Sequence, residues 1–277
     1  MVKIVTDSSV DLPEALARDL DVTVVPLSIN FGDKSYVDGR DIDTATFYRM
    51  LQSEQAHPRT AAPPAGLFEE AYRRLASEGH EIVAILLADT LSGTYNSAAL
   101  AARNMPEARV TLIDSHAVSM AMGMLVIRAA RLARDGKTAA EIAEAVRALI
   151  PRLELLLMTD TLTYLQRGGR IGRASSLVGT MLNIKPIISL RDGQVTPLQR
   201  VRTRGKALQE MANIAKGWTP FDDVYIMHSA APEVAAELAA LIRPLHGGKD
   251  VPALPLGPVV GVHLGPGSVG VTALRGG

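Results

Sequence analysis

Apolar and polar residues follow one another in a repeating order along this chain. An apolar run of strand length comes first, then a short loop rich in hydroxyl side chains, and then a segment that favours a helix. The run at residues 82–87 is unbroken, which is typical of a strand buried on both faces of a parallel sheet. The alanine-rich residues 96–103 predict the helix. The polar loop between them contains Asp89, Thr90, Ser92, Gly93 and Thr94.

The same order occurs at two other places. Residues 2–5 predict a buried strand that leads into the hydroxyl-containing loop 6–9, and residues 110–113 predict one that leads into the loop 114–116. Open α/β sheets bind ligands beyond the carboxyl ends of their strands, and the unpaired N–H groups of a helix start favour an anion. The three loops therefore predict an anion-binding edge.

Purely structural roles compete with binding for two of these features. Ser92 and Thr94 are also residue types that cap a helix start. The helix predicted at 118–134 carries Met120, Met124 and Ile127 on one face, where methionine fits ordinary core packing as well as an adaptable apolar surface. The sequence leaves both alternatives open.

The remaining elements indicate two α/β domains. Residues 57–64 contain three prolines, so we expect an irregular, stiff loop that holds Thr60 in place. A new apolar strand begins after Pro151, which predicts domains at 1–151 and 152–277. Further strands are predicted at 22–29, 153–158, 186–190, 195–197 and 224–227, and further helices at 44–52, 67–77, 177–184, 206–216 and 232–241.

Composition narrows the function classes. The 277 residues are 47% hydrophobic, which is enough for a sizeable core, and the 29 basic residues equal the 29 acidic ones. This balance argues against nucleic acid or an acidic membrane surface as the main partner. The chain has no cysteine and begins without a signal-peptide pattern, so we expect a cytoplasmic protein. No apolar stretch has the ~20 residues of a membrane span.

Catalytic motifs are poorly supported. Gly265, Gly267 and Gly270 have the spacing of a dinucleotide fingerprint, but the chain ends too soon for the helix and acidic residue that the fingerprint needs. The sequence has no phosphate-binding loop, no Gly-x-Ser-x-Gly elbow and no metal-ligand spacing among its histidines, so neither cofactor nor metal is predicted. His263 lies in a glycine-rich stretch predicted as a loop, where it either faces a ligand or is satisfied structurally.

Two groups of arginines stand out on this neutral chain. Residues 164–173 read Tyr-Leu-Gln-Arg-Gly-Gly-Arg-Ile-Gly-Arg, and a second group lies at 200–204. Both fit either a solvated surface or a local docking patch for an acidic partner.

Several ordered motifs together resemble the DegV family of bacterial fatty-acid-binding proteins, which includes the acyl-binding subunit of fatty acid kinase. They run from end to end: Thr6-Asp7-Ser8-Ser9, Leu91-Ser92-Gly93-Thr94-Tyr95, Asp114-Ser115, Tyr164-Leu165, Gly168-Gly169-Arg170-Ile171, Lys185-Pro186-Ile187, Arg202-Thr203 and residues 261–267 around His263.

The resemblance implies an α/β fold of two domains, with a mostly parallel N-terminal sheet flanked by helices, a mixed C-terminal sheet, and a ligand tunnel between the domains. It implies a non-catalytic, lipid-binding role in phospholipid metabolism: the protein binds a long-chain fatty acid and presents its carboxylate to a separate fatty acid kinase. By similarity, Thr60, Ser92 and His263 would hold the carboxylate, with Gly93 and Thr94 beside it, while Arg170 and Arg202 would dock the kinase.

This sequence departs from the family pattern at two positions. The usual Thr-Ser-Gln-Pro loop is Thr60-Ala61-Ala62-Pro63 here, and Leu264 stands where threonine is frequent. Two other functions stay open: a hydrolase or phosphotransferase that uses Ser92 and His263, and a carrier of another anionic amphiphile.

Overall fold

The computed structural model describes residues 1–53, 57–177 and 184–277. The chain divides into two compact units, of which the first comprises residues 1–30, 35–41 and 60–151. The second comprises residues 31–34, 42–59 and 152–277, so two segments from the N-terminal half belong to it. The linear domain division at residue 151 stays a prediction, because these units are not continuous in sequence.

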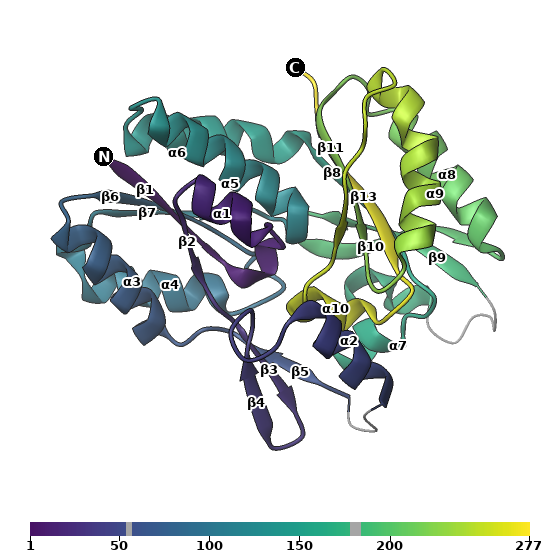
Figure 1. The fold of residues 1–277 in the computed structure, drawn as a ribbon, viewed down its shortest axis with the longest axis horizontal. Helices are drawn as coiled ribbons and strands as arrows, with labels where there is room; N and C mark the ends of the chain where they lie inside the picture. Colours follow the sequence, from purple (N-terminus) through teal and green to yellow (C-terminus); the bar gives the residue numbers. More distant parts are fainter. Residues whose placement is uncertain (54–56, 178–183) are drawn as a thin grey trace. The chain divides into compact units, whose positions relative to one another are not determined.

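The first unit is built on a four-stranded parallel sheet in the order β2-β1-β6-β7. Its strands are β1 (Val2–Asp7), β2 (Val22–Val25), β6 (Glu81–Leu86) and β7 (Val110–Asp114). Its helices are α1 (Glu14–Asp19), α3 (Ala65–Ser77), α4 (Thr94–Asn104), α5 (Ser119–Arg134) and α6 (Ala139–Leu149). Helices α3 and α4 pack together and cover one face of the sheet, while α5 and α6 cover the other (Figure 1).

Strand β6 has the two-sided burial that its sequence predicts. Every residue from 82 to 87 is at most 4% exposed, because helices lie on both faces of the sheet. The side chains of Ile82, Ala84 and Leu86 pack into one core with Phe68 and Tyr72 of α3.

A three-stranded sheet, β4-β3-β5, corrects two sequence expectations. It contains β3 (Ser28–Phe31), β4 (Lys34–Val37) and β5 (Arg59–Ala61). The single strand expected at 22–29 is wrong, because Pro26 separates β2 from β3 and proline cannot donate to a ladder. The irregular loop expected at 57–64 is also partly wrong, since β5 lies within it.

The second unit contains a six-stranded mixed sheet in the order β10-β9-β8-β13-β11-β12. Strands β11 and β12 pair in parallel, while the other neighbouring strands described in this sheet are antiparallel. The strands are β8 (Leu153–Met158), β9 (Lys185–Arg191), β10 (Gln194–Val201), β11 (Phe221–His228), β12 (Ala253–Pro255) and β13 (Val269–Arg275). The predicted α/β class, with a parallel first sheet and a mixed second sheet, is confirmed.

Several helices accompany this second sheet. They are α2 (Thr44–Ser53), α7 (Thr163–Arg167), α8 (Arg204–Lys216), α9 (Pro232–Ile242) and α10 (Pro258–Leu264). Helices α8 and α9 pack over the sheet in the main core of the unit, while α10 packs on α2 and α7 (Figure 1). Most of the helix predicted at 177–184 lies outside the described residues, and Leu177 ends a 3-10 turn. In the described part of the chain, every helix is too short or too polar to serve as a membrane span.

Two tyrosines differ in how their buried hydroxyls are satisfied. Tyr72 is fully buried and, among the described residues, its hydroxyl has no hydrogen-bond partner, whereas the Tyr48 hydroxyl donates to Leu256 O at 3.1 Å. An unpaired buried hydroxyl costs about 1–3 kcal/mol. We therefore expect Tyr72→Phe to raise the free energy of unfolding by about 1 kcal/mol. The matched change Tyr48→Phe should lower it by a similar amount, and urea denaturation measures both. Equal effects of the two changes would contradict this assignment.

Candidate functional site

The loop after β6 places the hydroxyls of Ser92 and Thr94 together. Their oxygens lie 2.9 Å apart, and Ser92 Oγ also accepts from Thr94 N at 3.3 Å. Helix α4 begins at Thr94, two residues before the predicted start, so Gly93 takes the N-cap position and makes no side-chain cap. Ser92 is half-buried and Thr94 is fully buried. Within the first unit, the partner of Ser92 Oγ is therefore a hydroxyl and not a base that would activate it as a nucleophile.

The three loops predicted at the carboxyl edge of the first sheet contact one another. Ala88 N donates to Ala117 O at 3.0 Å, which joins the loop after β6 to the loop after β7. The buried carboxylate of Asp7, at the end of β1, accepts from Leu87 N at 2.9 Å and from Ser9 Oγ at 2.5 Å. Complete burial raises the pKa of Asp7 even though these donors favour its ionised form. The loops contact one another because parallel pairing brings the carboxyl ends of these strands to the same edge of the sheet.

Asp38 extends this edge and was not predicted from the sequence. The residue is 9% exposed, and its carboxyl group bonds to the Ser8 hydroxyl and the Gly39 backbone, while Asp38 N donates to Leu27 O at 3.0 Å. Burial, assisted by the nearby charge of Asp7, raises the pKa of Asp38 to about 6. No local motif marks this residue, since its burial depends on contacts with a distant loop.

Thr60 lies in β5 and is half-buried. It is therefore held by strand pairing and not by a proline-rich irregular loop. The two prolines after Ala62 precede α3, which begins at Ala65. Thr60, Ser92, Gly93 and Thr94 all belong to the first unit.

His263 lies in the second unit, on helix α10, so its expected place in a glycine-rich loop is wrong. Gly257 is the N-cap and Pro258 occupies the first turn, where its missing N–H costs nothing. The glycine-rich turn comes after the helix, where Gly265 and Gly267 have φ of 70° and 82°. Burial and the nearby Arg170 lower the pKa of His263 to about 4. The imidazole is therefore neutral at pH 7.

Glycine makes the approach to His263 possible. A Cβ added at Gly168 would lie 2.2 Å from His263 Nδ1, and one added at Gly265 would lie 2.2 Å from the Tyr164 ring. Helices α7 and α10 therefore pack at distances that only glycine permits at these two positions.

The two predicted docking arginines belong to the same unit but have different surroundings. Arg170 is half-buried, and its Nη1 donates to Gly168 O at 2.7 Å. Arg202 is exposed after β10, next in sequence to the N-cap Thr203 of α8. Its neighbour Arg204 is paired with Asp160 at 3.2 Å.

The sequence missed His57 and Tyr164 as neighbours of this cluster. The two rings lie 5.5 Å apart with an interplanar angle of 48°. Burial, together with Arg167 and Arg59, lowers the pKa of His57. The Tyr164-Leu165 motif was noted in the sequence, but a lone histidine 107 residues earlier gives no signal of contact.

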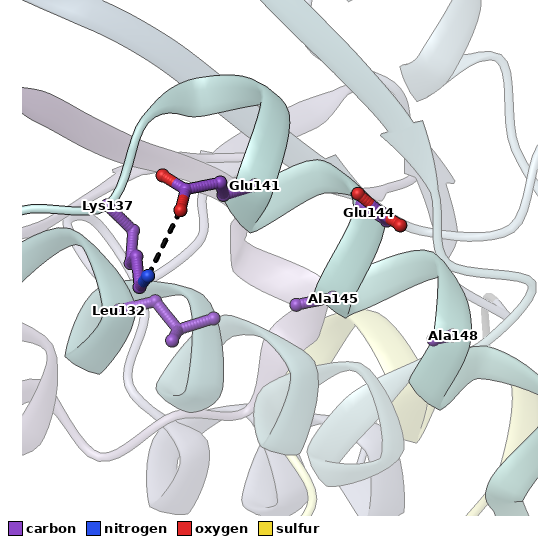
Figure 2. Close-up of a pocket in the computed structure, with 6 residues that line it drawn as sticks. All are labelled: Leu132, Lys137, Glu141, Glu144, Ala145 and Ala148. Atoms are coloured by element: carbon purple, nitrogen blue, oxygen red, sulfur yellow. Dashed lines mark hydrogen bonds and ion pairs between the residues drawn. The ribbon is translucent and has the colours of Figure 1, made fainter.

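A pocket of about 400 Å³ lies elsewhere in the first unit, between α5 and α6. Figure 2 shows the side chains of Lys137 and Glu141 pointing toward each other beside Leu132, with Nζ and Oε1 3.0 Å apart. Leu132, Ala145 and Ala148 give it apolar walls, and it contains no predicted site residue. Over the described ranges, His, Asp and Glu side chains do not gather in threes that would hold a metal ion.

Known proteins match the chain from end to end. Residues 1–276 match the model of a family described as uncharacterised proteins of the DegV family. A DegV domain-containing protein from Streptomyces coelicolor is 38% identical over 275 residues, which cover 98% of this chain and 97% of the relative. A solved DegV family protein from Thermus thermophilus, described by its fatty acid binding, is 32% identical with a TM-score of 0.92 over 99% of each chain. A stearic acid-binding protein from Eubacterium ventriosum is 28% identical with a TM-score of 0.91, over 99% of this chain and 98% of its own.

Proposed function

Because this chain belongs to the DegV family, we propose that it binds a long-chain fatty acid and presents the acyl carboxylate to a separate fatty acid kinase. The strongest support is the end-to-end structural match to the fatty-acid-binding protein of Thermus thermophilus. The role is that of a non-catalytic lipid carrier in phospholipid metabolism, and the cytoplasmic location expected from the cysteine-free sequence is part of the proposal.

The chemistry of the candidate residues suits a carboxylate. An ionised carboxylate needs compensating donors when it leaves water, and the hydroxyls of Thr60, Ser92 and Thr94 with the amide of Gly93 are such donors. His263 adds a neutral imidazole that donates without a second charge. An apolar tunnel for the tail completes the proposal, since about 0.8 kcal/mol per buried CH₂ gives a sixteen-carbon chain on the order of 10 kcal/mol before ordering costs.

The first test concerns the ligand and Ser92. We expect mass spectrometry of an organic extract to detect a bound fatty acid, and the delipidated protein to take up chains of about C14 to C20. Ser92→Ala should weaken binding by about 1–2 kcal/mol, because it removes a hydrogen bond to a charged group. Ser77→Ala is the control, since Ser77 is exposed at the end of α3 and bonds to Arg74 O.

Two results would contradict these expectations. Failure of the delipidated protein to bind any of these fatty acids would refute the lipid-carrier function. A covalent acyl-Ser92 adduct formed during ester turnover would favour the hydrolase or phosphotransferase alternative.

The second test concerns kinase docking by Arg170 and Arg202. Each change to alanine should leave the fatty-acid content unchanged and slow phosphorylation by the kinase about three- to tenfold at low ionic strength. The wild-type rate should fall as salt rises, and the rates of both variants should fall less steeply, because salt screens the attraction that they have lost. Arg243→Ala is the control, since Arg243 is an exposed arginine paired with Asp250 in the same unit. Loss of lipid from either variant, or wild-type rates at every salt concentration, would contradict the docking role.

A further inference from the structure

The C-terminal end of helix α10 depends on contacts from outside the helix. The helix spans only Pro258–Leu264 and carries His263 in its last turn. A helix of seven residues is not stable on its own, so the place of its side chains depends on what its two ends contact. The last carbonyl groups of a helix have no partner within the helix and need donors from elsewhere. The donors at this end therefore hold the last turn, and His263 with it.

Two serines, Ser229 and Ser268, supply these donors, and we call them the serine pair. The Ser229 hydroxyl donates to Gly265 O at 2.6 Å, and the Ser268 hydroxyl donates to Leu264 O at 3.0 Å. Both serines are fully buried. Each of the two carbonyls that follow His263 directly in the chain therefore accepts from a buried hydroxyl.

The serine pair continues the ladder between two interior strands of the second sheet. Ser229 follows β11 directly, and Ser268 directly precedes β13. The two strands pair antiparallel, with His228 opposite Val269 at this end. Beyond that point Ser229 N donates to Ser268 O at 2.9 Å, and Ser229 Oγ accepts from Ser268 N at 3.0 Å. The end of α10 is thus tied to paired strands inside its own unit.

We propose that Ser229 and Ser268 are positioning residues that hold the His263 imidazole in place for the carboxylate of the ligand. They act through the carbonyls of the two residues after His263, which fix the direction of the last helical turn. This inference rests on the proposed function, because it explains how a residue assigned to the carboxylate is kept in position.

The surroundings of His263 give its position a measurable signature. Burial, followed by the charges of Arg170 and His57, lowers the pKa of His263 to about 4. The ring is closely enclosed on one side, since a Cβ added at Gly168 would lie 2.2 Å from its Nδ1 atom. An imidazole that leaves this enclosure gains contact with water, and its pKa rises toward the ordinary value of 6.5.

The first arm of the test compares a charged and an uncharged ligand that share a tail. Calorimetric titration measures the affinity of the delipidated, full-length protein for palmitate and for hexadecanol. Ser229→Ala removes the donor to Gly265 O, so palmitate should bind about five- to tenfold more weakly and hexadecanol less than about twofold. Ser268→Ala removes the donor to Leu264 O and should show the same preference. Equal losses for the two ligands, or wild-type palmitate affinity in both variants, would overturn the positioning role.

The control removes a buried hydroxyl that bonds elsewhere in the second unit. Thr272 is fully buried in β13, and its Oγ1 donates to Glu154 O at 2.8 Å. Thr272→Val should lower the free energy of unfolding, as Ser229→Ala does, and should leave both affinities unchanged. A loss of palmitate affinity equal to that of Ser229→Ala would show that the serine pair acts on stability alone.

The second arm needs no ligand and separates this inference from the proposed function. The His263 ring resonances are titrated by NMR in the delipidated protein. The His263 midpoint should rise by about half a unit or more in Ser229→Ala and stay unchanged in Thr272→Val. An unchanged midpoint in Ser229→Ala would refute the positioning role even where palmitate binds. Failure of the wild type to bind palmitate would refute the proposed function, while the titration would still decide whether the serine pair positions His263.

Discussion

Gly168→Ala is expected to lower the affinity for long-chain fatty acid at least about tenfold, a loss comparable to that of a charged hydrogen bond. The new Cβ would lie 2.2 Å from Nδ1 and 2.9 Å from Cε1 of His263, and 3.1 Å from Tyr164 O. Two of these three atoms belong to the imidazole and the third is a backbone oxygen, so the added methyl group has to displace the imidazole. Gly168 has a φ of −76°, which alanine adopts freely. The effect is therefore steric and acts on the histidine that we assign to the carboxylate.

The neighbouring glycine gives the matched control. Gly169 has a φ of 70°, and a Cβ added there would meet no atom within 4 Å. Gly169→Ala should lower the free energy of unfolding by about 1–2 kcal/mol through backbone strain and should leave fatty-acid affinity near the wild-type value. Calorimetric titration with palmitate measures affinity, and urea denaturation measures stability. An equal loss of affinity in both variants would show that displacement of His263 does not cause the weaker binding.

The local pattern predicted those parts of the fold that depend on local chemistry. The apolar run at 82–87 was identified as a strand buried on both faces because both of its faces are apolar, and the loop at Ser92 followed from the abrupt change to polar residues. The helix at His263 was missed, although Gly257-Pro258 is a recognised helix-start signal, because the many glycines nearby favoured a turn. Strand β13 was missed for a related reason, since it follows directly after the turn at Gly265 and Gly267 and itself contains Gly270.

The sequence did not predict burial that depends on residues far apart in the chain. His57 acquires its environment from Tyr164, and Asp38 acquires its own from Ser8, which lies 30 residues earlier. Periodicity predicts that a segment is a helix or a strand, but it does not state which core the segment joins. Residues 31–34 and 42–59 illustrate this limit. The pattern within 42–59 predicts helix α2 correctly, but it does not indicate that both segments belong to the second compact unit.

The largest expected effect on stability concerns the carboxyl group of Asp38. Its pKa is about 6 in the folded protein and close to 3.8 when the chain is unfolded. A carboxyl group whose pKa is raised by folding does not destabilise the fold at a pH below its unfolded-state pKa, because it is protonated in both the folded and the unfolded state. The folded state then loses stability as pH rises through the folded value, because the ionised form is desolvated. At about 1.36 kcal/mol per unit, the loss between about pH 4 and pH 7 is on the order of 3 kcal/mol.

Asp38→Asn should therefore raise the free energy of unfolding at pH 7.5 and leave it nearly unchanged at pH 4. The amide keeps an acceptor for Gly39 N and gains a donor for the Ser8 hydroxyl, so the contacts of the loop survive. Burial also raises the pKa of Asp7, so part of the pH dependence of stability should remain in this variant. Asp41→Asn is the control from the same loop: that carboxylate is exposed, and Arg40 lowers its pKa, so its removal should not relieve the loss at high pH. Urea denaturation at half-unit steps measures the three curves, and an Asp38→Asn curve parallel to the wild type would show that Asp38 is ionised without cost in the fold.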